Sequence, residues 1–241
     1  MGQLKWPVSA QPIFSSDATQ RHPLGARGED IFGRVYRYCL AGAVDLVVGN
    51  VIQAAAQQAN HQDLTPSVAA IGDKTITATA GATAASANDY AGGVAVIDTT
   101  PGIGYSYPIK GHDAWTNGAV AGGVVLQLGD GWAVVIALTA VSRVSIYANP
   151  YARVIQSPVT TLTNVPVGVC QYIITAAQYG WLGVHGHFGT LIQGTPGVGL
   201  AVGPPGSAAG AVAINTSTNP IVGYMMDTGQ DAKVEGVFWV L

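Results

Sequence analysis

The sequence predicts an all-β protein: an antiparallel sandwich or barrel-like body of short strands, preceded by an extended N-terminal arm. Three observations lead to this prediction. Side chains alternate with a period of two in the glycine-rich stretch 168–203. Turn signals recur about every 8–12 residues along the chain. No segment shows the sustained 3.6-residue period of an amphipathic helix.

The stretch 168–203 is the clearest strand in the sequence. Its glycines at 180, 183, 186, 189 and 194 argue against a helix, in which each internal glycine costs about 1 kcal/mol relative to alanine. We expect Trp181 to fill the space that these glycines leave, in the core or at a subunit contact. The alternation predicts Leu182, Val184, Phe188 and Ile192 on one face, and Trp181, His185, His187 and Leu191 on the other.

The N-terminal segment 1–33 is predicted to be an extended arm, because it contains three prolines and polar clusters and has no sustained period. Residues 1–37 hold five cations and three anions, net +2, whereas the rest holds five cations and ten anions, net −5. The arm therefore needs a surface outside its own segment to lie on, and an acidic one suits it. The interaction residues predicted for the arm are Trp6, Ile13, Phe14, Arg21 and Arg27.

The predicted body comprises residues 34–241, with the option of two β subdomains that divide near 110–120. The strand 31–40 alternates with aromatic side chains on one face, and threonine and alanine alternate in the hairpin-like stretch 75–87. The apolar run Trp132–Val141 has a length suited to a buried strand. Further short strands are predicted at 143–148, 153–156, 167–174, 211–215, 221–226 and 234–241.

Composition excludes several classes of protein. Of the 241 residues, 49% are hydrophobic and only 10% are charged, against about 25% in ordinary soluble proteins. We therefore expect a chain that folds and then assembles with neighbours. No apolar run approaches the ~20 residues of a membrane-spanning helix, and the N-terminus predicts neither secretion nor a lipid anchor. The negative net charge disfavours nucleic-acid binding.

Candidate catalytic and metal residues are few. His185 and His187 share a strand face and offer two zinc ligands, but a third ligand is missing nearby, so histidines on a wetter face or at a subunit contact are the preferred interpretation. Ser106 lacks the glycine setting of a nucleophile elbow. Cys39 and Cys170 lie in apolar stretches and are predicted to be buried thiols. We expect no enzyme, no catalytic or metal residues and no cofactor.

Several short motifs stand out as a set. They are Gly33-Arg34-Val35-Tyr36-Arg37-Tyr38 with Gly42 and Leu46-x-x-Gly49, Ala91-Gly92-Gly93-x-Ala95-Val96 with Pro101-Gly102-x-Gly104 and Tyr107-x-Ile109, Asn149-Pro150-Tyr151 with Val154, and Val167-Gly168-Val169 with Tyr179-Gly180-Trp181. Together these motifs resemble the structural proteins of tailed-bacteriophage virions, in particular the head decoration, or cement, proteins.

The resemblance implies an all-β subunit, commonly a trimer, which binds the major capsid protein on the outside of an icosahedral capsid and stabilises the shell. It implies synthesis in the host cytoplasm and a final location on the virion. The arm would then dock on an adjacent copy or on the capsid. Two alternatives remain: another virion component such as a tail or fibre protein, and a glycan-directed hydrolase that would use Ser106, His185 and His187.

Overall fold

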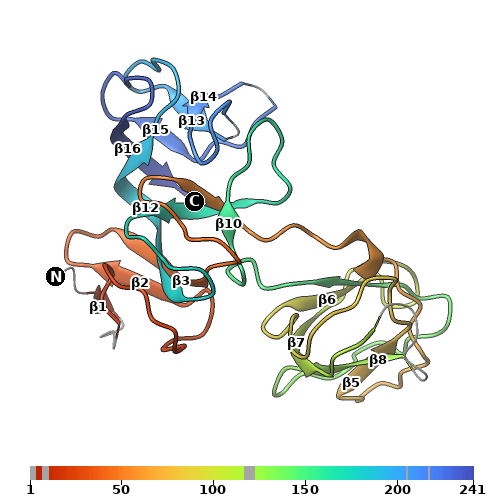
Figure 1. Ribbon diagram of the computed structural model, residues 1–241. Helices are drawn as coiled ribbons and strands as arrows, with labels where there is room; N and C mark the ends of the chain where they lie inside the picture. Colours follow the sequence, from red (N-terminus) through yellow and green to blue (C-terminus); the bar gives the residue numbers. More distant parts are fainter. Residues whose placement is uncertain (1–3, 7–10, 117–122, 205, 217) are drawn as a thin grey trace. The chain divides into compact units, whose positions relative to one another are not determined.

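The computed structural model describes residues 4–6, 11–116, 123–204, 206–216 and 218–241, and they form the all-β fold that the sequence predicts (Figure 1). Sixteen strands are present in these residues, and the only helical element is the 3-10 turn η1 (Ala59–His61). The chain divides into two compact units. Unit 1 comprises Met1–Ala56 and Pro150–Leu241, and unit 2 comprises Gln57–Asn149. The second unit is therefore an insertion in the first.

The insertion begins and ends at neighbouring strands of unit 1. β4 (Val51–Gln53), just before unit 2, pairs with β10 (Ile155–Gln156), just after it, and Gln53 lies opposite Ile155. The sequence instead suggests a division near 110–120, a range that overlaps β7 (Ser106–His112) inside unit 2. Hydrogen bonds between β7 and β8 (Val124–Leu128) join the two sides of that range. The strand pairing, which local composition does not reveal, thus makes 57–149 one unit.

Unit 1 is built on one antiparallel sheet that curls around its core. The strands follow the order β1-β2-β3-β12-β16-β15-β13-β14, and β4, β10 and β11 extend it beside β12. The remaining bounds are β1 Leu4–Trp6, β2 Arg27–Asp30, β3 Val35–Leu40, β11 Pro166–Cys170, β12 Tyr179–Leu191, β13 Ala201–Gly203, β14 Ala213–Ile214, β15 Gly223–Met225 and β16 Val234–Val240.

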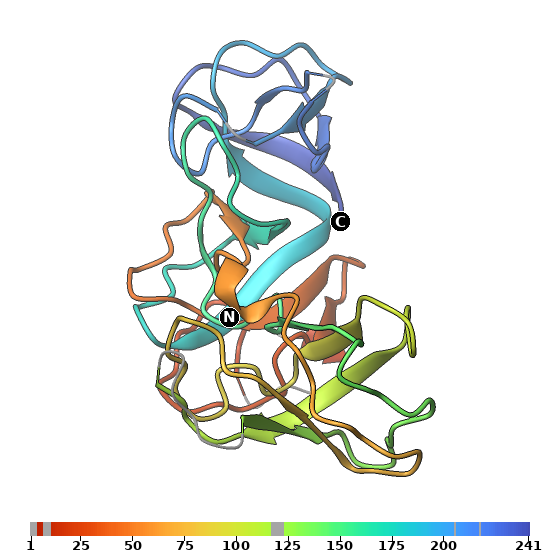
Figure 2. The same ribbon diagram turned by 90° about the vertical axis from the view of Figure 1, so that its right-hand side faces the viewer.

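The thirteen-residue strand β12 is the centre of this sheet, because it pairs with β3, β11 and β16. Its register on β3 shifts between Gly183 and His185, and Gly186 takes a φ of +108°, which side chains rarely adopt. Figure 2 shows that the ribbon of β12 is bent. The long strand was predicted correctly, and its glycines provide the bend.

The predicted division of faces along β12 is wrong, because the bulge shifts the alternation by one residue. Trp181 and Phe188 were assigned to opposite faces, but both belong to one core, and the Phe188 ring lies where Gly183 has no side chain. Leu182 packs into a second core on the other side of the sheet, with Cys39, Cys170 and others. Trp181 is 1% exposed, which confirms its predicted place in the core.

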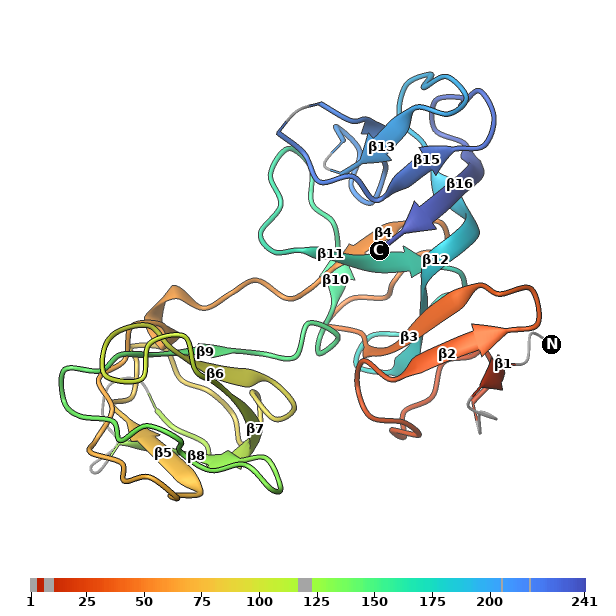
Figure 3. The same ribbon diagram turned by 180° about the vertical axis from the view of Figure 1, so that it is seen from behind.

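Unit 2 contains a five-stranded antiparallel sheet of order β5-β8-β7-β6-β9 (Figure 3). The bounds not yet given are β5 Thr75–Ala78, β6 Val94–Ile97 and β9 Val144–Tyr147. The segment 64–66 connects its two edge strands, because Leu64 pairs with Val144 of β9 and Pro66 pairs with Ala78 of β5. This bridge covers both edges and encloses an apolar core separate from those of unit 1.

Two strand predictions need correction. The predicted strand 31–40 begins only at Val35, because Ile31–Gly33 form the turn after β2, and Phe32 does not join the buried Tyr36 and Tyr38. The predicted buried strand Trp132–Val141 is an irregular segment with several side chains in solvent. Its apolar composition resembles that of a core strand, but Val134 and Leu138 are its only large apolar side chains that are buried.

Candidate interaction surfaces

The five residues predicted to anchor the arm lie in a segment that packs on the chain's own unit 1. Ile13 is 1% exposed and belongs to the core around Trp181, whereas Phe14 is about half exposed. Arg21 pairs with Asp17 (2.8 Å) and Arg27 with Glu29 (3.0 Å). Trp6 lies in β1 with its backbone opposite Glu29, and its side chain is outside the described part.

The arm is tied to β3 and β12 by buried hydrogen bonds. The Gln11 side-chain carbonyl accepts from the Tyr38 hydroxyl (2.6 Å), and the Gln11 backbone carbonyl accepts from Trp181 Nε1 (3.2 Å). Asp17 and Tyr179 exchange two backbone hydrogen bonds. The arm therefore does rest on a surface outside its own segment, as predicted. That surface belongs to the same chain, so residues 11–30 are part of unit 1 and are not a separate arm.

The turn between β2 and β3 is held firmly by one carboxylate. Asp30, 4% exposed, accepts from the backbone N–H of Phe32 (2.9 Å) and of Arg34 (3.0 Å), and from Arg34 Nε (2.7 Å). Burial raises the pKa of Asp30, but the hydrogen bonds from Arg34 and the backbone outweigh it and hold the pKa below its usual value. The Arg34 guanidinium also lies over the Phe188 ring, 5.5 Å from its centre.

This rigid turn carries two large apolar side chains in solvent. Ile31 and Phe32 are 74% and 73% exposed, and we call the pair the hairpin tip. Gly33, with φ +77°, closes the turn without a side chain. Because the turn is fixed by its own hydrogen bonds, ordering the tip in a complex costs little further entropy. The hairpin tip is therefore a preorganised apolar anchor.

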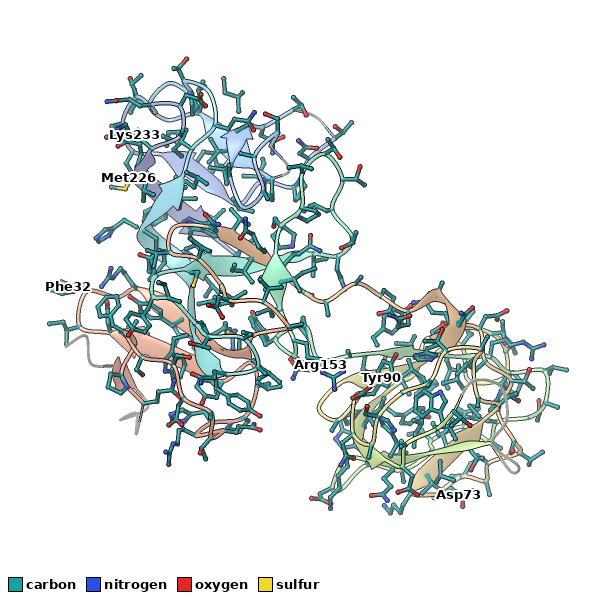
Figure 4. The ribbon with its side chains drawn as sticks, in the orientation of Figure 1. Phe32, Asp73, Tyr90, Arg153, Met226 and Lys233 are labelled. Carbon is teal, nitrogen blue, oxygen red and sulfur yellow. The ribbon has the colours of Figure 1, made fainter. Side chains whose placement is uncertain are left out.

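A second apolar surface lies on the outward side of β12, β15 and β16. In register, His187 lies opposite Phe238, which in turn lies opposite Tyr224, and His185 lies opposite Val240. Figure 4 shows Phe32 of the tip and Met226, which follows β15, on the same side of unit 1. These outward side chains include no Asp, Glu, Lys or Arg, and we call them the sheet face: His185, His187, Tyr224, Met226, Phe238 and Val240.

Unit 2 exposes an apolar surface of its own. The segment 69–73 runs beside 134–138, with paired hydrogen bonds between Ala69 and Leu138 and between Val134 and residues 72 and 73. Asp73, labelled in Figure 4, marks one end of this pairing. The buried side of the pairing carries Val134 and Leu138. Large side chains on these two segments, and on residues just before or after them, are exposed. We call them the ribbon: Val68, Ile71, Val135, Ile136 and Val141.

The candidate chemical residues belong to different units of the chain. His185 and His187 are exposed on β12 of unit 1, which confirms the preferred interpretation of a wetter strand face. Ser106 is exposed at the start of β7 in unit 2. Within the described residues, no three His, Cys, Asp or Glu side chains are grouped in a way that could hold a metal ion.

Both cysteines are buried and free, as predicted. Burial raises the pKa of the Cys170 thiol to about 11 and that of Cys39 well above its usual value. At neutral pH both are therefore thiols and not nucleophilic thiolates.

A buried polar cluster in unit 2 was not predicted. His61 Nδ1 contacts the Tyr90 hydroxyl, and His61 Nε2 faces the Thr83 carbonyl (2.8 Å), which also accepts from Trp115 Nε1 (3.0 Å). The backbone N–H of Tyr90 donates to His112 Nε2 (3.0 Å), whose Nδ1 faces the Asp113 carbonyl (2.8 Å). Each imidazole thus has a polar partner at both of its ring nitrogens.

Comparison with protein-family models, with curated proteins and with solved structures finds no match for this chain. No helix in the described ranges has the length and apolarity needed to cross a membrane.

Sequence reasoning missed the hairpin tip and the sheet face, although one signal for the tip was present. Ile31 and Phe32 stand between Glu29-Asp30 and Gly33-Arg34, a position whose flanking residues favour a turn. Two consecutive large apolar residues in such a turn have no core to enter. The sheet face had no comparable signal, because its exposure depends on the bulge in β12 and on the pairing of β15 with β16.

Proposed function

We propose that this protein is a structural component of a virion, which binds the outer surface of an icosahedral phage capsid and stabilises it as a decoration protein. Its partners are the major capsid protein and further copies of itself, most simply in a homotrimer. The proposed location is the capsid exterior, after synthesis in the host cytoplasm. The proposal assigns the chain no catalytic role and no cofactor.

The ribbon of unit 2 is the observation that carries this proposal. The run Trp132–Val141 contains no charged residue and has the composition of a core strand, yet Val135, Ile136 and Val141 are exposed. Val68 and Ile71, in and beside the segment paired with this run, are exposed as well. Apolar patches of this kind mark surfaces that a partner covers. We assign the ribbon to the capsid contact, in which a shell protein would bury it.

The low charge of the chain also supports an assembled state. Only 10% of the residues are charged, so electrostatic repulsion between neighbouring subunits is small. Interfaces between permanent partners are likewise depleted of charge at their centres. The motifs that resemble head decoration proteins occur in both units, which adds to the support. The hydrolase alternative would have to combine Ser106 of unit 2 with His185 and His187 of unit 1.

The test is whether the chain occurs on phage particles, and where. Antibodies against the full chain should label the heads of purified particles, and the chain should be present at a copy number comparable to that of the capsid protein. Label confined to tails would replace the proposal with the tail or fibre alternative. Absence of the chain from particles would refute both.

A ribbon variant tests the assigned surface. Val135→Ser with Val141→Ser should weaken binding of the purified chain to undecorated capsids at least tenfold and leave thermal unfolding unchanged, because both side chains are exposed. Val44→Ser is the matched control, since Val44 is 72% exposed in unit 1 outside the ribbon. Equal binding by the ribbon variant and the wild type would contradict the assignment.

A further inference from the structure

A pocket opens in unit 1 where two segments of the sheet diverge. Its volume of about 540 Å³ lies within the range of about 300–1,000 Å³ that small-molecule sites occupy. The space beside Gly194 is empty, because no atom apart from its chain neighbours lies within 4 Å of the position that a Cβ would take there. Six residues line this pocket, which we call the β14 pocket: Gln193, Gly194, Thr195, Ala213, Ile214 and Asp231.

The β14 pocket lies where a ladder of backbone hydrogen bonds stops. β14 ends the sheet of unit 1 (Figure 1), and on the side away from β13 a parallel bridge joins Val212 to Ile192. The Gln193 N–H donates to the Val212 carbonyl (2.8 Å). The next bond of a parallel ladder would run from the Ile214 N–H to the Gln193 carbonyl, and within the described residues it is not made. The two segments separate at this step.

Ile214 therefore presents its backbone N–H and C=O to the pocket. The Asn215 N–H donates to the Ala201 carbonyl of β13 (2.9 Å), so Asn215 and Ala201 form a hydrogen-bonded pair. Such pairs alternate with non-bonded ones along an antiparallel ladder, and the next pair, Ile214 and Val202, is thus non-bonded. The Ile214 N–H and C=O point away from β13, which leaves one donor and one acceptor for a ligand.

Asp231 adds a carboxylate to the same pocket. Its Oδ1 accepts from the Gly194 N–H (2.7 Å), which fixes the side chain at the pocket wall. In the described part of the chain, no Lys, Arg or His forms an ion pair with Asp231. The Gln193 side chain is engaged elsewhere, because its amide bonds to the backbone N–H and the hydroxyl of Ser207. The second oxygen of Asp231 is therefore the strongest acceptor that the pocket offers.

These groups select a neutral ligand that is rich in hydroxyl groups. The carboxylate repels an anion, and a cation would meet the positive end of the Ile214 N–H dipole. A hydroxyl group both donates and accepts, so adjacent hydroxyls can donate to Asp231 and accept from the Ile214 N–H. The Ile214 side chain, 49% exposed, offers an apolar contact to C–H groups. A sugar ring combines adjacent hydroxyls with such C–H groups.

We propose that the β14 pocket binds a neutral saccharide, and that Asp231 and the Ile214 backbone hold adjacent hydroxyl groups of it. The lining contains one carboxylate, whereas glycoside hydrolysis ordinarily uses two, so we assign binding and no reaction to the pocket. The inference goes beyond the proposed function and does not rest on it, because the pocket belongs to unit 1 and the capsid contact was assigned to unit 2.

An NMR titration of the full chain tests the proposal through the backbone amide signals of Gly194 and Ile214. The probes are the methyl glycosides of glucose, galactose and mannose, and N-acetylglucosamine. Each is added up to about 100 mM, so that a Kd near 10 mM is still detected. At least one probe should shift both signals to saturation. Propylammonium chloride is the competing cationic probe. Saturating shifts with propylammonium alone, or with none of the saccharides, would overturn the proposal.

Two variants each remove one of the polar groups. Asp231→Asn keeps an oxygen for the Gly194 N–H but loses the charge, and should weaken saccharide binding at least tenfold. Ile214→Pro removes the N–H that faces the pocket, at an edge position where proline is tolerated, and should have a similar effect. Ile214→Val keeps this N–H and is the control for the proline variant. Asp73→Asn changes another exposed carboxylate that accepts from a backbone N–H, and is the control for Asp231→Asn.

Both controls should bind saccharide like the wild type. Unchanged binding by Asp231→Asn would refute the assigned contact. If Ile214→Pro lowers the melting temperature, Asp231→Asn decides alone, since this isosteric change preserves the bond to Gly194. A chain that decorates capsids but binds no saccharide would refute only the inference. A chain that binds saccharide in the β14 pocket but does not bind capsids would support the inference and refute the proposed function.

Discussion

Unit 1 and unit 2 are both antiparallel β structures, but their cores contain different kinds of side chain. The core of unit 1 around β12 is largely aromatic and aliphatic, with Trp181, Trp239, Tyr36, Tyr38 and Phe188, and the arm covers part of it. The core of unit 2 places His61 and His112 among Tyr90 and Trp115. The two units therefore have similar architectures, but different substitutions are expected to destabilise each of them.

The largest expected effect tests whether the two units are independent. Trp181→Ala should destabilise unit 1 by about 3–5 kcal/mol, because a ring that is 1% exposed leaves a cavity. Trp115→Ala should do the same to unit 2, where this ring is also buried. Calorimetry of each variant should show one of two transitions lowered. A single transition whose temperature both variants lower equally would show that the two units unfold together.

The next effect concerns the carboxylate that holds the hairpin turn. Asp30→Ala should destabilise unit 1 by about 2–4 kcal/mol, because it leaves Arg34 and two backbone N–H groups without their acceptor. Calorimetry should show unit 2 unchanged. If the variant melts like the wild type, the turn is not held as described.

The pH dependence of this carboxylate follows from its lowered pKa. The folded protein favours the ionised form of Asp30, so its stabilising effect is complete above the unfolded value of about 3.9 and is lost only as the pH falls through the lower folded value. Between pH 7 and pH 5 the contribution of Asp30 should therefore stay constant.

A histidine of unit 1, His22, also has a shifted pKa, and its ring lies 5.2 Å from those of Tyr38 and Trp181. Burial lowers the pKa of His22, so the folded state binds its proton less readily and unit 1 loses some stability as the pH falls below about 6.5. His22 is partly exposed, so the loss should be small. His22→Gln should remove the acid sensitivity of unit 1 alone.

The last prediction concerns the two cysteines, which we expect not to react in the folded protein. Both thiols of unit 1 have raised pKa values, so alkylating reagents at pH 7 should modify neither cysteine in the folded chain and both after denaturation. Mass spectrometry of native and denatured samples counts the adducts. Rapid labelling of Cys39 in the native chain would show that this core opens easily.

The sequence was sufficient for the fold class and for the central strand, because glycines, turn residues and period-two alternation are local signals. Trp181 was placed in the core for the same reason. The side chains beyond Gly183 were assigned wrongly, since a bulge depends on the partner strand β3. Insertion of unit 2 depends on pairing between β4 and β10, about a hundred residues apart. No local pattern contains that information.

The interaction surfaces were harder still to predict from the sequence. Trp132–Val141 has the composition of a buried strand, and only the structure shows that Val135 and Val141 face solvent. An apolar run indicates that something covers it, but the sequence does not say whether the cover is the same chain or a partner. For Ile13 the cover is the same chain; for the ribbon we propose a partner.

The central claim is that the exposed apolar surfaces of this chain are covered when it functions. Hydrogen exchange measured by mass spectrometry on capsid-bound and free chain tests it most directly. The account predicts slower exchange on binding in peptides covering 66–74 and 132–141, while β5 and β8 in the unit 2 core stay unchanged. Bound chain whose ribbon peptides exchange as fast as in the free chain would contradict it.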